Sequence, residues 1–224
     1  MLNDRLAVGV SQSGGVVGLY DNPDDPLYER RLQTLFCFHY PDILVRPSLA
    51  VLRSTVDLNG SGKFAQYILP WSQVLTVDDM NINDKNKKES QLVKPVVCGT
   101  VSGGLVYIYR ISPLLFDALK VLQRLLLRYE PTKPLLGTAE DFEHWYSNLS
   151  GTETSSIHGD VIESFLRLSP IEQLEIVNGV RESEEIRKVF EPLLINSDVD
   201  YGVEQASAIV NFIKDMLFDF QTFR

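Results

Sequence analysis

Residues 157–166 read IHGDVIESFL, and this decamer says more about the fold than any other stretch of the chain. Gly159 lets the chain turn, and Asp160 stands where the positive end of a helix dipole favours a carboxylate. The apolar side chains that follow have the spacing of one buried helical face. They are Val161, Ile162, Phe165 and Leu166. The decamer therefore predicts a helix packed against a core.

The composition is typical of a globular protein. The chain has 224 residues, of which 44% are hydrophobic and 23% are charged, which is ample for a buried core. No basic region followed by an apolar stretch opens the sequence, and charged residues interrupt the longest apolar run, 114–127, so we expect neither a signal peptide nor a membrane span. Two cysteines, Cys37 and Cys98, cannot form a disulfide framework, which favours a reducing compartment.

Charge is divided unevenly along the chain. Residues 1–110 contain 11 Lys/Arg and 11 Asp/Glu, whereas residues 111–224 contain 10 and 19, so the second part carries the whole formal charge of −9. Contacts with nucleic-acid phosphates require clustered Lys and Arg. Direct nucleic-acid binding is therefore the least favoured of the functions considered below.

Residues 1–111 are predicted to form a β domain, because short runs rich in Val, Ile, Tyr and Phe alternate there with turn residues. The candidate strands are residues 6–10, 16–20, 32–39, 49–53, 67–77, 96–100 and 105–110. Residues 112–224 are predicted to be helical instead. The fold class expected from this order is α+β.

Two segments of the β half resemble each other. Residues 7–20 read AVGVSQSGGVVGLY, and residues 96–109 read VVCGTVSGGLVYIY. Each contains a strand, a Ser-Gly-Gly turn and a second strand, and glycine supplies the positive φ of a tight hairpin. The copies lie 89 residues apart, from Gly15 to Gly104, whereas a β-propeller blade takes about 40–45 residues. The spacing fits two blades, or one blade with a long insertion, and a β-sandwich remains an alternative.

The helical half carries clear start signals. Ser112 and Pro113 predict a helix cap followed by proline at the first helical position. Capping-box spacing recurs at Thr138 with Asp141 and at Ser169 with Glu172. Apolar stripes follow at Leu115, Leu119, Leu122, Leu126 and Tyr129, and at Val203, Ala206, Val210, Ile213, Leu217 and Phe220. We expect the last stripe to find its partner face within the same domain.

The decamer is similar to the segment I-D-G-D-L-I-E-S-F-L of one family: the large damaged-DNA-binding subunit, the large subunit of the cleavage and polyadenylation factor, and their splicing-factor relative. Eight positions match, Ile157 and Ser164 together with the family-motif residues Gly159, Asp160, Ile162, Glu163, Phe165 and Leu166, whereas His158 and Val161 depart from the pattern. The resemblance extends over most of residues 5–178. It includes Phe38-His39, the turn at 98–104, and the aromatic residues Phe142 and Trp145, but not Tyr40-Pro41.

In that family, a C-terminal helical domain closes three β-propellers in a chain several times longer. The resemblance therefore implies the last blades of a propeller (1–111) followed by the helical domain (112–224). We expect a fragment, a truncated form, or a short relative that completes its propeller with another chain.

The resemblance also implies a nuclear scaffold, with the cytoplasm as a second location, that acts through protein contacts. An adaptor of a cullin-RING ubiquitin ligase in DNA repair is slightly favoured by E-S-F-L at 163–166. Its partners would be substrate receptors and the rest of the scaffold. The alternative is a subunit of an mRNA 3′-end cleavage, polyadenylation or splicing complex, because residues 165–172, FLRLSPIE, resemble the cleavage-factor branch. Nucleic acid would be contacted only through partners.

No catalytic or cofactor-binding pattern stands out in the sequence. Gly60-Ser-Gly-Lys63 is similar to a phosphate loop, but Asp57 and Phe64 occupy positions that need glycine and Ser/Thr. The His and Cys residues lack zinc spacing. We therefore predict a non-enzyme without metal or cofactor. Because loop tips carry binding in rigid scaffolds, the candidate partner-binding residues are Ser11, Gln12, Ser13, Arg46 and Ser102.

Overall fold

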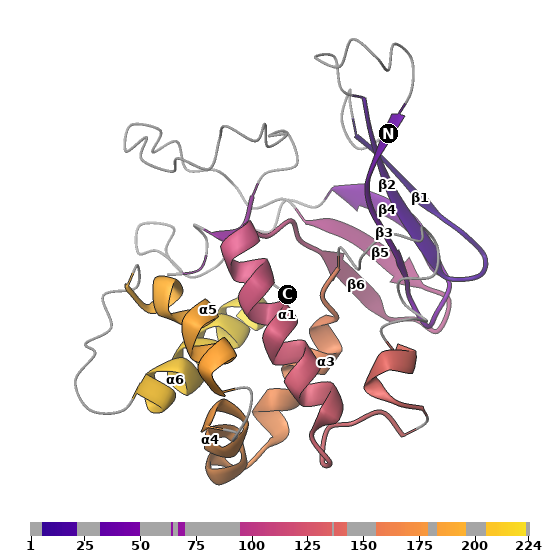
Figure 1. The fold of residues 1–224 in the computed structure, drawn as a ribbon. Helices are drawn as coiled ribbons and strands as arrows, with labels where there is room; N and C mark the ends of the chain where they lie inside the picture. The colour runs from indigo at the N-terminus through magenta and orange to yellow at the C-terminus, as the bar shows by residue number, and fades with distance from the viewer. Residues whose placement is uncertain are drawn as a thin grey trace, which may run out of the picture. The chain divides into compact units, whose positions relative to one another are not determined.

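The computed structural model (Figure 1) describes residues 6–21, 32–49, 64, 67–69, 95–135, 137–142, 156–178, 183–195 and 205–222. Within these residues the fold is α+β, with two three-stranded antiparallel sheets and six helices, one of them a 3₁₀ helix. The chain divides into two units. Of the described residues, the first contains both sheets and Ser156; the second contains the helices together with Phe64 and Tyr67.

The first sheet has the order β1 (Leu6–Val10), β2 (Gly15–Asp21), β3 (Leu32–His39), and it confirms the strands predicted at these places. Gly18 on β2 pairs with Phe36 on β3. A Cβ at Gly18 would lie 2.2 Å from the Phe36 ring. Glycine therefore lets an aromatic side chain cover the backbone of the neighbouring strand.

The second sheet has the order β4 (Leu44–Leu49), β5 (Val96–Thr100), β6 (Leu105–Ile108). Most of β4 was not predicted. Of the strand predicted at 49–53, only Leu49 is described, as the last residue of β4, and most of 67–77 also lies outside the described part. Pro47 lies within β4, although proline removes a donor from a sheet ladder. The strand accommodates it at a β-bulge between Val45 and Ser48, where Arg46 has a φ of 51°.

One apolar cluster joins the two sheets. It contains Val16 and Phe38 from the first sheet and Leu44, Val96 and Cys98 from the second. Burial raises the pKa of the Cys98 thiol to about 11, so this side chain stays protonated and packs as an apolar group.

The long helix of the second unit is α1 (Pro113–Arg128), and its predicted start is confirmed. The Leu115 N–H donates to the Ser112 Oγ at 3.3 Å, and Pro113 opens the helix. Four leucines of the predicted stripe are buried: Leu115, Leu119, Leu122 and Leu126. The helix ends three residues before Pro131, with Tyr129 as its C-cap.

The decamer forms two short helices rather than one. α3 (Gly159–Glu163) gives way to the 3₁₀ helix η3 (Ser164–Arg167). The Ser164 Oγ donates to the Val161 carbonyl at 2.6 Å at this junction. Of the predicted apolar face, Ile162 and Phe165 are buried, whereas Val161 and Leu166 are half-buried.

The first residues of α3 differ in part from expectation. Asp160 lies in the first helical turn, as predicted. Gly159 does not make a turn, because it is the first helical residue and is not among the glycines of positive φ. The residue before it, His158, packs its ring edge-on against Phe142 at 5.3 Å, and burial lowers its pKa to about 4. His158 is therefore a neutral side chain of the helical core.

Three further helices complete this unit: α4 (Pro170–Asn178), α5 (Ser183–Ile195) and α6 (Gln205–Thr222). The predicted capping box is present, since the Ser169 N–H donates to the Glu172 carboxylate at 2.7 Å and the Glu172 N–H to the Ser169 Oγ at 3.4 Å. The α6 stripe packs into the helical core, as expected, through Ala206, Val210, Ile213 and Leu217. Val203 lies outside the described residues, as does Trp145.

Candidate protein-contact site at the paired turns

The two Ser-Gly-Gly turns make the same hydrogen bonds. The Ser11 N–H donates to the Gly15 carbonyl at 2.7 Å, and the Thr100 N–H donates to the Gly104 carbonyl at 2.9 Å. The side-chain hydroxyls of Ser11 and Thr100 accept from the N–H of Gly15 and Gly104, at 2.9 and 2.8 Å. Ser11 also contacts the Ser13 hydroxyl, just as Thr100 contacts that of Ser102. The sequence repeat is therefore a structural repeat.

The connection between β3 and β4 binds to both turns. The Tyr40 N–H donates to the Gly14 carbonyl at 2.8 Å, and the Val101 N–H donates to the Ile43 carbonyl at 3.0 Å. The Asp42 carboxylate accepts hydrogen bonds from the Ser102 N–H, at 3.3 Å, and from the Ser102 hydroxyl. Both turns therefore lie at the same end of the β unit.

Asp42 is held in its charged form by this arrangement. The Ser102 hydroxyl is the largest cause that lowers the pKa of its carboxyl group, with smaller contributions from the Ile43 N–H and from Thr100. Desolvation acts in the opposite direction and is outweighed.

The structure separates the five predicted binding residues into two groups. The hydroxyls of Ser11, Ser13 and Ser102 hydrogen-bond within the turns and to Asp42. Gln12 at the tip of the first turn and Arg46 at the β4 bulge are exposed side chains. The serines therefore shape this end of the unit, and Gln12 and Arg46 are exposed side chains beside it.

The sequence analysis missed an apolar surface beside the second turn. Four of the eight exposed large apolar side chains in the described part of the chain lie on or next to the second sheet. We call them the outer face: Ile43, Val45, Val101 and Leu105, of which the last two are 65% and 64% exposed. Gly99 pairs with both Val45 and Leu105 and adds no side chain between them. Successive side chains of a strand point to opposite faces of its sheet. This alternation along β4 and β6 was the sequence signal that could have separated the outer face from the core positions.

Equivalent positions of the repeat point to opposite sides of the shared core. In the first sheet, Val16 pairs with Val10 and lies in the core. The equivalent pair 89 residues later is Leu105 with Gly99, and Leu105 lies on the outer face. Conversely, Cys98 is in the core although its equivalent, Gly9, is on the other face of its sheet. The sheets are thus stacked front to back rather than with like faces together.

The family-motif residues of the decamer do not form a surface site. Ile162 and Phe165 are buried, Glu163 and Leu166 are half-buried, and Gly159 and Asp160 are exposed at the helix start. Ile162 and Phe165 therefore pack α3 and η3 against the helical core.

Among the described residues, no group of three or more His, Cys, Asp or Glu side chains is placed to hold a metal ion, and no described helix is long and apolar enough to cross a membrane. The chain matches no protein-family model and no curated protein.

Proposed function

We propose that this chain is the C-terminal part of a non-catalytic β-propeller scaffold, consisting of its last blades and a helical domain, and that it acts through protein contacts. The observation that carries the proposal is the front-to-back stacking of the two sheets. In such a stack, each sheet buries one face against its predecessor and offers the opposite face to a successor. The outer face is the equivalent of the face that the first sheet buries.

The chemistry of the outer face supports a further protein layer on it. Clustered apolar side chains rimmed by polar groups are typical of protein contact surfaces. Here the rim contains Asp42, Ser102 and the exposed Arg46. A sheet of the same scaffold would cover the apolar centre, and partner segments would meet the polar rim.

The resemblance of the decamer favours the damaged-DNA-binding and cleavage-factor family within this class. A cullin-RING ubiquitin ligase adaptor is our first choice, acting in the nucleus with substrate receptors as partners. The second choice is an RNA-processing subunit, favoured by the Ser169–Glu172 capping box, since the cleavage-factor branch has Ser and Glu at this spacing.

The test is a quantitative pull-down with the tagged chain, co-expressed with the upstream part of the scaffold where the locus encodes one. We expect the wild type to retain the scaffold, and Leu105→Glu to lose it, because a buried charge opposes apolar packing. Ile171→Glu is the matched control, since Ile171 is 79% exposed on α4 and belongs to the helical unit, not to the unit that contains the outer face. Equal retention by both variants would contradict the proposal.

The co-purified proteins then decide between the two branches. Cullin and substrate receptors support the adaptor, whereas polyadenylation or splicing subunits support RNA processing. Retention on DNA or RNA alone, weakening steeply with salt, would instead support direct nucleic-acid binding.

A further inference from the structure

A segment from the β half of the sequence belongs to the core of the helical unit. Phe64 and Tyr67 lie between β4 and β5 in the sequence, yet they pack with the helices and are only 2% and 5% exposed. We call residues 62–69, GKFAQYIL, the aromatic segment. Its described part lies beside the start of α1 (Figure 1).

Residues of α5 and α6 hold both rings of the aromatic segment. The Phe64 ring packs edge-on against Phe212 of α6 at 4.9 Å, and Phe212 packs in the same way against Phe190 of α5 at 6.0 Å. The Tyr67 ring lies 6.5 Å from that of Phe64, and its hydroxyl donates to the Leu193 carbonyl at 3.5 Å. Buried aromatic anchors of this kind carry much of the affinity in protein recognition. We call Phe190, Leu193 and Phe212 the aromatic site.

The backbone of the aromatic segment closes a turn of its own and bonds to the cap of α1. The Tyr67 N–H donates to the Phe64 carbonyl at 2.9 Å, and the Ser112 N–H donates to the Tyr67 carbonyl at 2.8 Å. The first of these bonds joins residues three apart, so it needs only the segment itself. The spacing of the two rings is therefore a property of the segment, and a separate peptide of the same sequence carries it.

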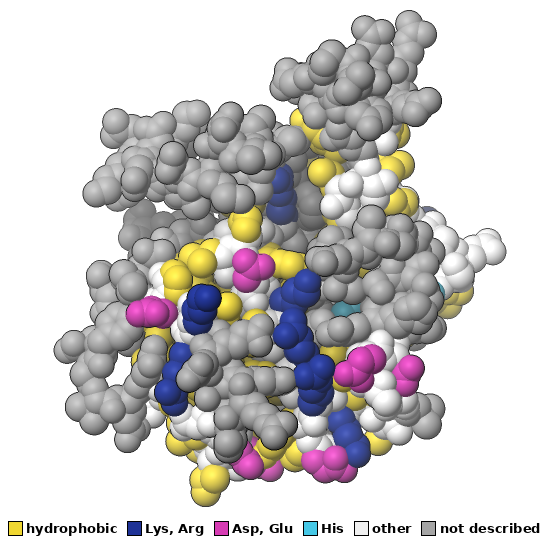
Figure 2. All heavy atoms as spheres, in the orientation of Figure 1, with side chains coloured by type: hydrophobic (Ala, Val, Ile, Leu, Met, Phe, Trp, Pro, Cys, Tyr) yellow, Lys and Arg dark blue, Asp and Glu magenta, His cyan; other side chains and the backbone are white. Residues whose placement is uncertain are grey.

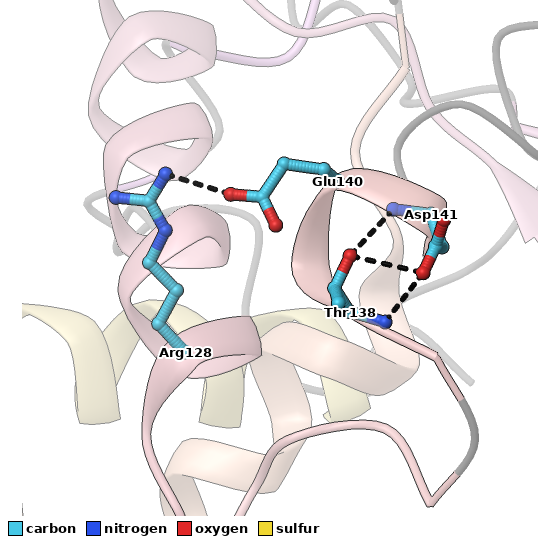
Figure 3. A network of polar contacts seen from close by, with 4 residues as sticks. All are labelled: Arg128, Thr138, Glu140 and Asp141. Atoms are coloured by element: carbon cyan, nitrogen blue, oxygen red, sulfur yellow. Dashed lines mark hydrogen bonds and ion pairs between the residues drawn. The ribbon is translucent and has the colours of Figure 1, made fainter.

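The helices around the aromatic site are held by contacts that do not involve the segment. α5 packs against both α1 and α6. At the end of α1, Arg128 Nη2 donates to Glu140 Oε1 at 3.2 Å, and hydrogen bonds between Thr138 and Asp141 fix the turn that carries Glu140 (Figure 3). Figure 2 shows Lys and Arg side chains in a row along the exposed side of α1, while its buried leucines pack into the core. We therefore expect the site to persist when the segment leaves it.

We propose that the helical unit binds protein segments in which Phe and Tyr lie three residues apart, and that the aromatic segment is an internal ligand that closes this site. A partner segment of the same chemistry enters only by displacing residues 62–69, because their two rings are buried there. Covalent attachment gives the internal ligand a high effective concentration, so it keeps weak partners out. The aromatic site belongs to the helical unit, so this inference does not depend on the outer face of the second sheet.

The experiment measures, by fluorescence anisotropy, the binding of a labelled peptide of residues 62–69 to the full chain. The open form is the double variant Phe64→Ala, Tyr67→Ala, whose internal ligand lacks both rings. The control variant is Phe218→Ala, which removes a phenylalanine that is 65% exposed on α6. The control peptide has Ala in place of both aromatic residues. Circular dichroism and thermal unfolding follow each protein with and without peptide.

We expect the double variant to bind the peptide about tenfold more tightly than the wild type, because apparent affinity falls with the fraction of chains whose site is closed. The peptide should also raise the Tm of the double variant, or restore its helix content if it is unfolded alone. Phe218→Ala should bind the peptide as weakly as the wild type. The proposal is overturned if the peptide neither binds nor stabilises the double variant, which would make the segment an ordinary part of the core. It is also overturned if the control peptide binds equally well, or if the wild type binds the peptide as tightly as the double variant.

Discussion

The two Ser-Gly-Gly turns share their internal hydrogen bonds but differ in what surrounds them. Gly14 is buried, and a Cβ there would lie 2.1 Å from the Tyr40 carbonyl oxygen. Gly103 is exposed, and a Cβ there would meet no atom within 4 Å. Both glycines have positive φ, 83° and 93°.

The difference shows that local sequence determines the shape of a turn, whereas its surroundings determine how much change it tolerates. Backbone atoms of the β3–β4 connection close over the first turn. The second turn is held by the Asp42 side chain and by the Val101 N–H bond to the Ile43 carbonyl, and it stays open next to Val101 and Leu105. The first turn is therefore enclosed by neighbouring backbone atoms, whereas the second turn is exposed.

The largest predicted effect comes from alanine at the two central glycines. We expect Gly14→Ala to lower the free energy of unfolding by about 3 kcal/mol, because backbone strain is added to a clash with Tyr40. Gly103→Ala should cost about 1 kcal/mol, from the positive φ alone. Urea unfolding of both variants measures the difference. Equal losses would show that Tyr40 does not restrict the first turn.

Removal of the capping hydroxyls should have a smaller and equal effect in the two turns. Ser11→Ala and Thr100→Val each remove the acceptor for one backbone N–H, of Gly15 or Gly104. We expect each to lower the free energy of unfolding by about 1 kcal/mol. Urea unfolding is again the measurement, with Gln12→Ala as a control that removes no hydrogen bond of the turn. A clearly larger loss of unfolding free energy in one variant would show that the two turns are not equivalent.

Much of the local structure was predictable from the sequence, because it depends on neighbouring residues. The hairpin glycines, the Ser112 cap and the Ser169–Glu172 capping box all appear where short-range patterns place them. The exact span of β3 followed from its β-branched and aromatic run bounded by turn residues. The α6 stripe also packed within its own unit.

The errors and omissions involve information that is not local. Most of β4 was not predicted; it contains Pro47, which a bulge accommodates. The decamer was read as one helix, whereas η3 continues after Glu163 with a tighter winding. The outer face was missed because apolar strand residues suggest a core until the register shows which of them point away from it.

The smallest predicted effect is a pKa change that separates the two turns. Asp42 has a lowered pKa, mainly through the Ser102 hydroxyl. Its stabilising contribution is therefore present above the ordinary carboxyl pKa of about 4 and is lost as the pH falls through the folded-state value. In carboxyl-detected NMR titrations, we expect Ser102→Ala to raise the Asp42 pKa, whereas Ser13→Ala, the equivalent change in the first turn, leaves it unchanged. If Ser102→Ala has no effect, the Ile43 N–H holds the charge instead, and the second turn is fixed by backbone contacts like the first.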